Sequence, residues 1–347
     1  MSTTVTAQSD VAHSAIVHAR WHGGEIAFWL IVLACAFVFP SRYLIMTDIL
    51  RLALFAMSLD LILGYAGIVS LGHAAFFGVG AYCAGLLALH GIITEPVLAL
   101  IVAGLAAMVL GFLTSFLVIR GVDLTRLMVT LGIALLLEAL AERYSNITGG
   151  TDGLQGIEMQ PILGIFAFDM FGKTGFFYSL IVVFVLFLLA RRIVHSPFGL
   201  SLRAIRNNPL RAAAIGIPVN RRLVAIYTVA AFYAGIAGAL FTQTTALASL
   251  DVFAFEKSAD LMLVLVIGGT GYLYGGLIGA VVFRMLQELF STITPQYWLF
   301  WIGLVLVAIV MVGRARLHRW VLWLPNLLIA QISGRKDAVA IPEGDAS

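Results

Sequence analysis

The feature that most constrains this chain is a series of long apolar runs joined by short polar connections, which recurs from about residue 26 to residue 313. About 20 apolar residues are enough for a helix to cross the hydrocarbon core of a bilayer. Lipid offers the backbone no hydrogen-bond partners, so only helices and closed barrels cross it, and these runs are too long for barrel strands. The sequence therefore predicts an all-α polytopic membrane protein.

The composition excludes a soluble domain, because 61% of the residues are hydrophobic and 11% are charged, whereas soluble domains carry about 25% charged residues. The net charge of +3 is modest. The arginines gather near the ends of apolar runs, which suits membrane orientation and not nucleic-acid binding. Cys35 and Cys83 lie inside apolar runs and form neither a disulfide framework nor a metal-ligand pattern. His18 and His22 would share a helix face, but we expect a solvated terminus there and no metal site.

We expect about ten transmembrane helices. Six lie near residues 26–45, 48–68, 73–91, 96–119, 124–143 and 176–190. A seventh crosses at 223–247, the stretch 253–290 crosses twice with a turn at Gly268 to Gly276, and 297–313 forms the last.

The arginines set the orientation of these spans. Residues 191–222 contain seven arginines and no acidic residue, so the positive-inside rule makes this loop cytoplasmic. The acidic stretch 144–175 then falls outside. The transmembrane domain would span residues 26–313, with residues 1–25 and 314–347 as cytoplasmic tails.

Two glycine-rich segments, 64–72 and 268–276, interrupt the apolar runs as breaks or hairpins. Irregular backbone within a membrane is tolerated only where protein or a watery cavity satisfies its polar groups. Glycine-interrupted segments in both halves of a chain point to a transport path, while close packing through small residues gives the same pattern. Both interpretations stay open. The candidate path residues from these segments are Gly67, Ser70, Gly268, Gly269 and Gly271.

Three ionisable residues fall within or beside predicted spans: Asp60, His73 and Glu138. Ionisable groups are costly in a membrane, so each is a candidate for solute contact by default. Asp60 and His73 flank the first glycine break. Each of the three has an alternative role as a buried structural partner.

The basic loop carries signals for two short helices. Ser196 before Pro197, and Asn208 before Pro209, each predict an N-cap with proline in the first turn. Gly216 is placed to end the second helix.

The first of these helices is predicted to be amphipathic. Phe198, Leu202 and Ile205 share one face, while Arg203 and Arg206 point elsewhere. The pattern suits docking against a partner protein, and it suits anionic lipid headgroups equally well.

Five stretches appear in the order known from one family: SLGHAAFFGVGAY from Ser70, TGGTDGL from Thr148, FGLSLRAIRNNPLRAAAIGI from Phe198, AGIAGAL from Ala234 and IGGTGYLYGGLIGA from Ile267. In these motifs the chain resembles the branched-chain amino acid (Liv-type) permease subunits of ABC importers, over most of residues 50–285.

The resemblance implies that the basic loop couples the chain to a cytoplasmic ATPase. The residues to which it assigns this role are Phe198, Leu202, Arg203, Ile205, Arg206, Asn208, Arg211 and Gly216. It further implies an inner-membrane complex with a second related permease, ATPase subunits and a periplasmic solute-binding protein that docks on outer loops including 144–175. The implied solutes are branched-chain amino acids or, alternatively, urea, short amides or aromatic acids.

Rival functions have weaker support. Residues 167–174 imitate a phosphate-binding loop, but no strand precedes them, so we expect this chain to bind no nucleotide. We also expect no cofactor and no enzymatic activity in this chain. An ion-coupled secondary transporter would use Asp60 and Glu138 as proton relays. The acid-free basic loop argues against it. An intramembrane enzyme has no His-Glu-x-x-His motif or nucleophile constellation to support it.

Overall fold

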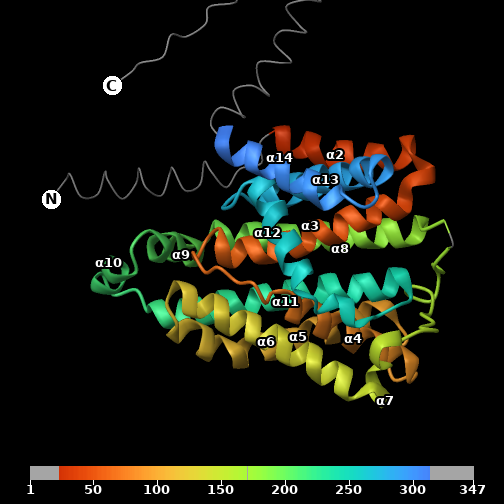
Figure 1. The fold of residues 1–347 in the computed structure, drawn as a ribbon, viewed down its shortest axis with the longest axis horizontal. Coiled ribbons are helices and arrows are strands. Elements are labelled where there is room, and N and C mark those ends of the chain that lie inside the picture. The colour runs from red at the N-terminus through yellow and green to blue at the C-terminus, as the bar shows by residue number, and fades with distance from the viewer. Residues whose placement is uncertain (1–22, 170, 313–347) are drawn as a thin grey trace, which may run out of the picture. The chain divides into compact units, whose positions relative to one another are not determined.

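The computed structural model of the chain describes residues 23–169 and 171–312, and within them thirteen α-helices and three short 3-10 helices (Figure 1). The predicted all-α architecture is confirmed for these residues. The C-terminal tail predicted for 314–347, most of the N-terminal tail predicted for 1–25, and His18 and His22 lie outside them.

The helices follow the apolar runs. Up to residue 152 they are α2 (Gly23–Val38), the 3-10 turn η1 (Pro40–Arg42), α3 (Tyr43–Leu63), α4 (Ala74–Leu89), α5 (Pro96–Arg120), α6 (Asp123–Arg143), the short α7 (Ser145–Thr148) and η2 (Gly150–Asp152). Beyond it they are α8 (Lys173–Val194), α9 (Pro197–Asn207), α10 (Pro209–Ala214), α11 (Val219–Thr245), η3 (Leu250–Val252), α12 (Phe255–Gly268), α13 (Leu273–Ile293) and α14 (Trp298–Val312).

Five of these helices are long and apolar enough to cross a membrane: α5, α6, α8, α11 and α13. The pair Gly23–Val38 and Pro40–Leu63 passes the same test together but bends by 97°, which makes up to six spans. Each of the ten predicted runs contains one helix. Because α4 and the described part of α14 are short, length and composition support five or six spans, and the figure of ten stays a prediction.

Contacts divide the chain into two compact units, Met1–Arg284 and Met285–Ser347. In the second unit the end of α13 leads into α14, and the rings of Phe290 and Trp301 stack with centroids 6.2 Å apart.

The central helix of the first unit is α11, which packs along its length against α3, α4 and α5. Small residues make this close approach possible. A Cβ atom added at Gly80 of α4 would overlap the backbone of Gly235, and one at Gly238 would overlap the carbonyl of Phe77. Helices in lipid gain no hydrophobic energy from meeting each other, so close backbone contact through small residues is their main attraction.

Buried hydroxyl groups add hydrogen bonds between these helices. The Tyr233 hydroxyl donates to the Leu186 carbonyl at 2.9 Å, and the Thr242 hydroxyl donates to the Ala81 carbonyl at 3.0 Å. Such bonds between transmembrane helices are worth about 0.6–2 kcal/mol each. They tie α11 to α8 and α4.

The outward face of α5 carries a continuous apolar stripe at intervals of four residues. Its members, all about half exposed, are Leu105, Val109, Leu113 and Leu117. A helix that hides small residues inward and shows leucine and valine outward is suited to lipid as its solvent.

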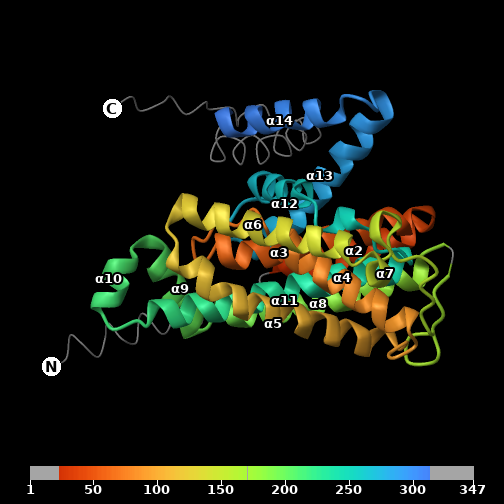
Figure 2. The ribbon, with the colours of Figure 1, turned by 60° about the horizontal axis from the view of Figure 1, so that its bottom comes forward.

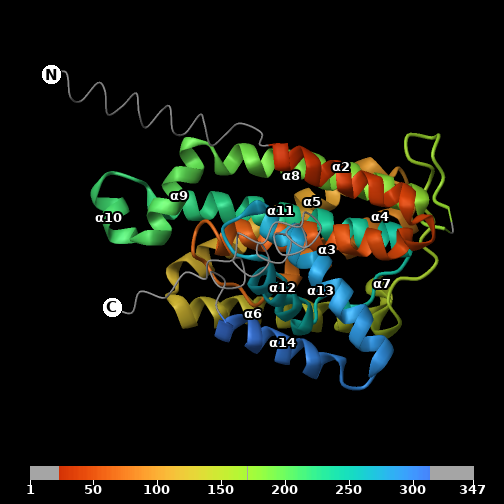
Figure 3. The same ribbon diagram turned by 90° about the horizontal axis from the view of Figure 1, so that it is seen from above.

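The first unit has two distinct ends. Figures 1, 2 and 3 all place α9 and α10 together at one end and α7 at the other. Helices α3 and α8 run toward the α9 end, and α11 runs back from it. These three helices therefore connect the two ends directly.

The packing of Gly80 gives a stability prediction. We expect Gly80→Val to lower the melting temperature of the purified protein in detergent, because the new side chain overlaps the Gly235 backbone and overpacking costs about 1–3 kcal/mol. The matched control is Gly132→Val on α6, where an added Cβ meets no atom within 4 Å. Equal melting of both variants would contradict the packing described here.

Candidate functional site

The two helices of the basic loop begin as their sequence predicts. The Ser196 side chain accepts a hydrogen bond from the Gly199 amide at 3.4 Å, with proline in the first turn of α9. The Asn208 side chain accepts from the Arg211 amide at 2.9 Å in the same way for α10. Gly216 follows α10 with φ of +86°, a left-handed conformation that favours glycine. Both predicted N-caps are confirmed.

One face of α9 is buried in the bundle. Leu202 and Ile205 are almost completely covered, and Phe198 is partly covered, with the Arg222 guanidinium 5.2 Å from its ring centre. Helix α10 instead presents apolar side chains to its surroundings, since Leu210 is 83% exposed and Ile215 is 70% exposed. Exposed apolar groups beside exposed arginines are typical of a surface that a partner protein covers.

The first glycine break, residues 64–73, folds back alongside α3. Its amides find partners within the protein: Ile68 donates to the Ile62 carbonyl at 2.9 Å and Leu71 to the Thr130 hydroxyl at 3.2 Å. The first amide of α4 donates to the Ser258 hydroxyl at 2.9 Å. The segment is thus irregular backbone whose polar groups are satisfied by neighbouring helices.

The second break is shorter than the predicted 268–276. Gly268 is the last residue of α12, and Gly275 and Gly276 belong to the first turn of α13, so only residues 269–272 are non-helical. Gly269 and Gly271 have φ of +103° and +83°. The other glycines of the predicted turn lie within helices, where they allow α12 and α13 to approach closely. A Cβ at Gly268 would overlap the Gly275 carbonyl.

The two breaks and α9 meet at one place. The Asp60 carboxylate accepts a hydrogen bond from the Gly271 amide at 2.7 Å, and the Arg206 guanidinium donates to the Gly64 carbonyl at the end of α3. A Cβ at Gly271 would lie 3.1 Å from the Arg206 guanidinium nitrogen Nη1. The Arg203 guanidinium lies 5.4 Å from the centre of the Tyr65 ring. We call this group of contacts the break junction.

His73 is fully buried beside the junction. The Ser58 hydroxyl donates to the Phe55 carbonyl at 2.5 Å, so its oxygen is the acceptor toward His73 Nε2 at 2.8 Å. The imidazole stacks on the Phe55 ring and meets the edge of Phe76. Ser70 is also fully buried. The contacts with Ser58, Phe55 and Phe76 fit the structural alternative for His73, whereas the Ser70 hydroxyl has no hydrogen-bond partner among the described residues.

Glu138 lies apart from the junction, on the part of α6 that approaches η3 and α12. The structure therefore brings Asp60, Gly67 and Gly271 together around Arg206 but leaves Glu138 out.

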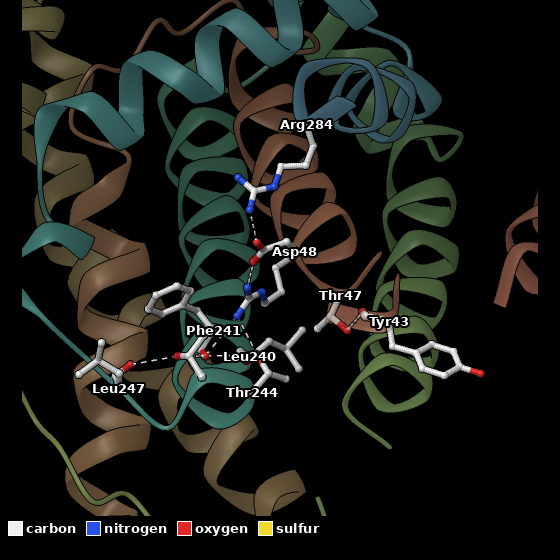
Figure 4. A network of polar contacts seen from close by, with 10 residues as sticks. Tyr43, Thr47, Asp48, Leu240, Phe241, Thr244, Leu247 and Arg284 are labelled. Carbon is white, nitrogen blue, oxygen red and sulfur yellow. Dashed lines mark hydrogen bonds and ion pairs between the residues drawn. The ribbon is translucent and has the colours of Figure 1, made fainter. Parts of the chain in front are cut away.

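Sequence analysis missed a second polar cluster, at the end of the unit away from α9. Asp48 and Arg51 of α3 form an ion pair, and Asp48 forms another with Arg284 of α13 at 2.6 Å (Figure 4). Arg51 also donates to the Thr244 hydroxyl at 2.7 Å. The predicted span 48–68 began at Asp48, so these charges resembled the polar boundary of a span. The spacing of three residues between Asp48 and Arg51 was the available signal.

Among the described residues no group of three or more His, Cys, Asp or Glu side chains is arranged to hold a metal ion. At the start of α8 the Asp169 carboxylate accepts from the Thr174 amide at 2.9 Å. Residues 167–174 imitate a phosphate-binding loop, which would hold a phosphate at the start of the helix. Here the Asp169 carboxylate occupies that position.

Comparison with known proteins gives one family. A family model described as "Branched-chain amino acid transport system / permease component" matches residues 42–310. The high-affinity branched-chain amino acid transport system permease protein LivM of Escherichia coli is 28% identical over 290 residues, which cover 75% of this chain and 67% of LivM. No solved structure matches the chain.

Two further relatives show the breadth of the similarity. The LivM protein of Salmonella typhimurium is 28% identical over 256 residues, 67% of this chain and 60% of that protein. The autoinducer 2 import system permease protein LsrC of Salmonella choleraesuis is 25% identical over 305 residues, 83% of this chain and 85% of LsrC. The chain thus spans about two thirds of the length of the two LivM proteins and most of LsrC.

The break junction makes a testable prediction at Asp60. We expect Asp60→Ala to destabilise the protein by about 1–3 kcal/mol, because the partly buried Gly271 amide loses its acceptor. The backbone of residues 269–272 should then exchange its amide hydrogens faster in deuterium exchange. Asp60→Asn keeps an oxygen acceptor and should show a smaller effect. Unchanged exchange in Asp60→Ala would rule out the role assigned to this carboxylate.

Proposed function

Because this chain belongs to the branched-chain amino acid transport permease family, whose members are transport subunits of ABC importers and not enzymes, we propose that it carries a small polar solute across the inner membrane into the cytoplasm. The observation that carries the proposal is the contact of α9 with the first glycine break through Arg206 and Gly64. Through this contact, a partner that binds the basic loop could move the backbone of the bundle directly. Arg206 also lies beside Gly271 of the second break.

We assign the docking of a cytoplasmic ATPase to α9 and α10. The exposed surface that these helices offer combines apolar, cationic and amide side chains: Leu210 and Ile215, Arg203 and Arg211, and Asn208. Leu202 and Ile205 anchor α9 in the bundle from the other side.

The mechanism follows from the break junction. A displacement of α9 moves Arg206 and with it the end of α3 at Gly64. Asp60, one turn earlier in α3, holds the Gly271 amide, so the second break moves together with the first. The left-handed glycines at both breaks supply backbone freedom for such hinge motion. ATP-driven closure of the partner would thereby rock helices α3 and α13 and open the path to each side in turn.

The solute we propose is a branched-chain amino acid, in line with the family description and the LivM relatives. Urea, short amides and aromatic acids are the alternatives. We further propose a complex with a second related permease, two ATPase subunits and a periplasmic binding protein that docks on residues 144–175. About ten spans, with the basic loop 191–222 and both termini in the cytoplasm, complete the proposed topology.

An ion-coupled transporter is the rival mechanism. Reconstitution of the chain with and without its ATPase subunits distinguishes the two. Uptake that depends on ATP and on the ATPase supports the importer, whereas uptake driven by an ion gradient with this chain alone would exclude it.

The docking surface can be tested by charge reversal. We expect Arg203→Glu, Arg206→Glu and Arg211→Glu together to reduce the ratio of solute uptake to ATP hydrolysis by about tenfold or more. The change reverses the charge of the docking surface, and at position 206 it also removes the donor to the Gly64 carbonyl. The control is Arg143→Glu at the far end of α6, exposed and outside the loop. A triple variant that keeps the original ratio would end the assignment of this surface.

The second break can be tested by substitution of its glycine. We expect Gly271→Val to stop uptake in protein that still inserts and assembles. Valine strains the backbone at φ of +83° and crowds the Arg206 guanidinium. The matched control is Gly91→Val, where φ is +65° and an added Cβ meets nothing within 4 Å. This pair separates crowding at the junction from backbone strain alone, which costs about 1–3 kcal/mol at either position.

A further inference from the structure

A cavity of about 580 Å³ opens at the end of the first unit away from α9, between α3, α8, α11 and the segment before α8. Its volume lies within the range of about 300–1,000 Å³ common for small-molecule sites. The charged and amide side chains that line it are Asp48, Arg51, Asp169, Gln243 and Arg284. The same cavity has an apolar part, lined by Leu44, Ile45, Ile157, Met159, Phe168 and Phe241.

Arg51 is the least expected member of this lining. Arg51 is only 7% exposed, and it lies in the third turn of α3, within an apolar run. Arginine inside a transmembrane bundle is costly, and where it occurs it marks a solute or ion pathway by default.

The guanidinium of Arg51 is held in a fixed position. It pairs with Asp48, donates to the Thr244 hydroxyl at 2.7 Å and to the Phe241 carbonyl at 3.3 Å, and lies 5.0 Å from the Phe241 ring centre. The Thr244 hydroxyl donates its own hydrogen to the Leu240 carbonyl at 2.7 Å, so its oxygen is an acceptor toward Arg51. Fixed donors bind an anion more tightly than mobile ones.

Arg51 keeps capacity for a further acceptor. A guanidinium has five N–H groups, and the contacts to Asp48, Thr244 and Phe241 use three of them. Asp48 divides its two oxygens between Arg51 and Arg284 (Figure 4). A solute carboxylate is the planar, two-oxygen partner that the remaining guanidinium face recognises.

The wall of the cavity also holds an acceptor for a cation. The Gln243 amide nitrogen donates to the Pro96 carbonyl at 2.8 Å, which fixes the orientation of the amide. Its oxygen Oε1 is buried and has no hydrogen-bond partner among the described residues. Asp169, exposed on the same lining, adds a carboxylate. Either acceptor is suited to an ammonium group.

We infer that this cavity is a binding site for a small zwitterionic carboxylate, with its carboxylate on Arg51, its ammonium group toward Gln243 Oε1 and its apolar part against the aliphatic lining. The inference rests on the proposed function, in which the chain is part of a solute path. It names the residues of the path and favours carboxylate solutes over neutral ones such as urea.

The test is direct binding to the purified chain in lipid nanodiscs, measured by the change in its melting temperature across a titration. The three probes are L-leucine, L-leucinamide, which lacks the carboxylate, and 4-methylpentanoate, which lacks the ammonium group. We expect L-leucine to bind most tightly, 4-methylpentanoate more weakly and L-leucinamide about tenfold or more weaker than L-leucine. Equal binding of L-leucinamide and L-leucine, or no saturable binding of L-leucine, would overturn the inference.

Two variants locate the site without unfolding the protein. The double variant Asp48→Asn with Arg51→Gln removes both charges of the Asp48–Arg51 pair together, so the buried Arg51 charge is not left without its carboxylate. Arg284 loses its bond to Asp48, but its side chain is 32% exposed. Gly175→Leu fills the cavity without removing any charge, because a Cβ at Gly175 meets only Thr244 Cγ2 at 3.5 Å. We expect each to weaken L-leucine binding by about tenfold or more. Unchanged affinity in both variants would place the solute elsewhere.

Uptake by the complete importer separates failure of this inference from failure of the proposed function. ATP-dependent uptake with an unchanged KM in Gly175→Leu would leave the function intact and refute the site. Saturable, Arg51-dependent binding in a chain that never supports ATP-dependent uptake would confirm the site and refute the function.

Discussion

The need to satisfy every backbone polar group within the bundle controls the rest of this structure. Long helices meet that need by themselves, but the chain breaks its helices at residues 64–73 and 269–272. Side chains from elsewhere then take over: Thr130 and Ser258 serve the first break, and Asp60 serves the second. Arg206 reaches the Gly64 carbonyl from outside the bundle. The basic loop is thus hydrogen-bonded to the chain at a break between helices. Movement of the loop can therefore displace the helices that meet at this break.

The packing of α11 makes the two ends of the unit mechanically related. Glycine and alanine bring the backbone of α11 close to α4 and α5, as at Gly80 and Gly235. Such an interface transmits displacement, because close-packed surfaces have little room to deform. Helices α3, α8 and α11 reach from α9 to the cavity around Arg51. A solute in that cavity and an ATPase on the basic loop of this permease would therefore act on the same helices.

Individual residues show how far sequence reasoning reaches. The caps at Ser196 and Asn208 were predictable because each involves groups within three residues of each other. Asp60 was recognised as unusual, but its partner Gly271 was not, since 211 residues separate them. His73 drew attention for the same reason as Asp60, yet its neighbours Phe55 and Phe76 enclose it. Arg51 escaped notice because a charge near a predicted boundary is ordinary, and only the fold shows that it is buried.

The sequence by itself determined that the helices are suited to lipid, and it determined the helices themselves, the two breaks and the basic loop. Each of these depends on local periodicity or on residue chemistry within a few positions, which a linear pattern records. Only the tertiary structure decided which groups meet: Arg206 with Gly64 across 142 residues, and Arg51 with Thr244 across 193. Those pairings arise from which helix faces pack together. In a bilayer that choice depends on small residues and shape complementarity and not on apolarity, which nearly every face of these helices shares.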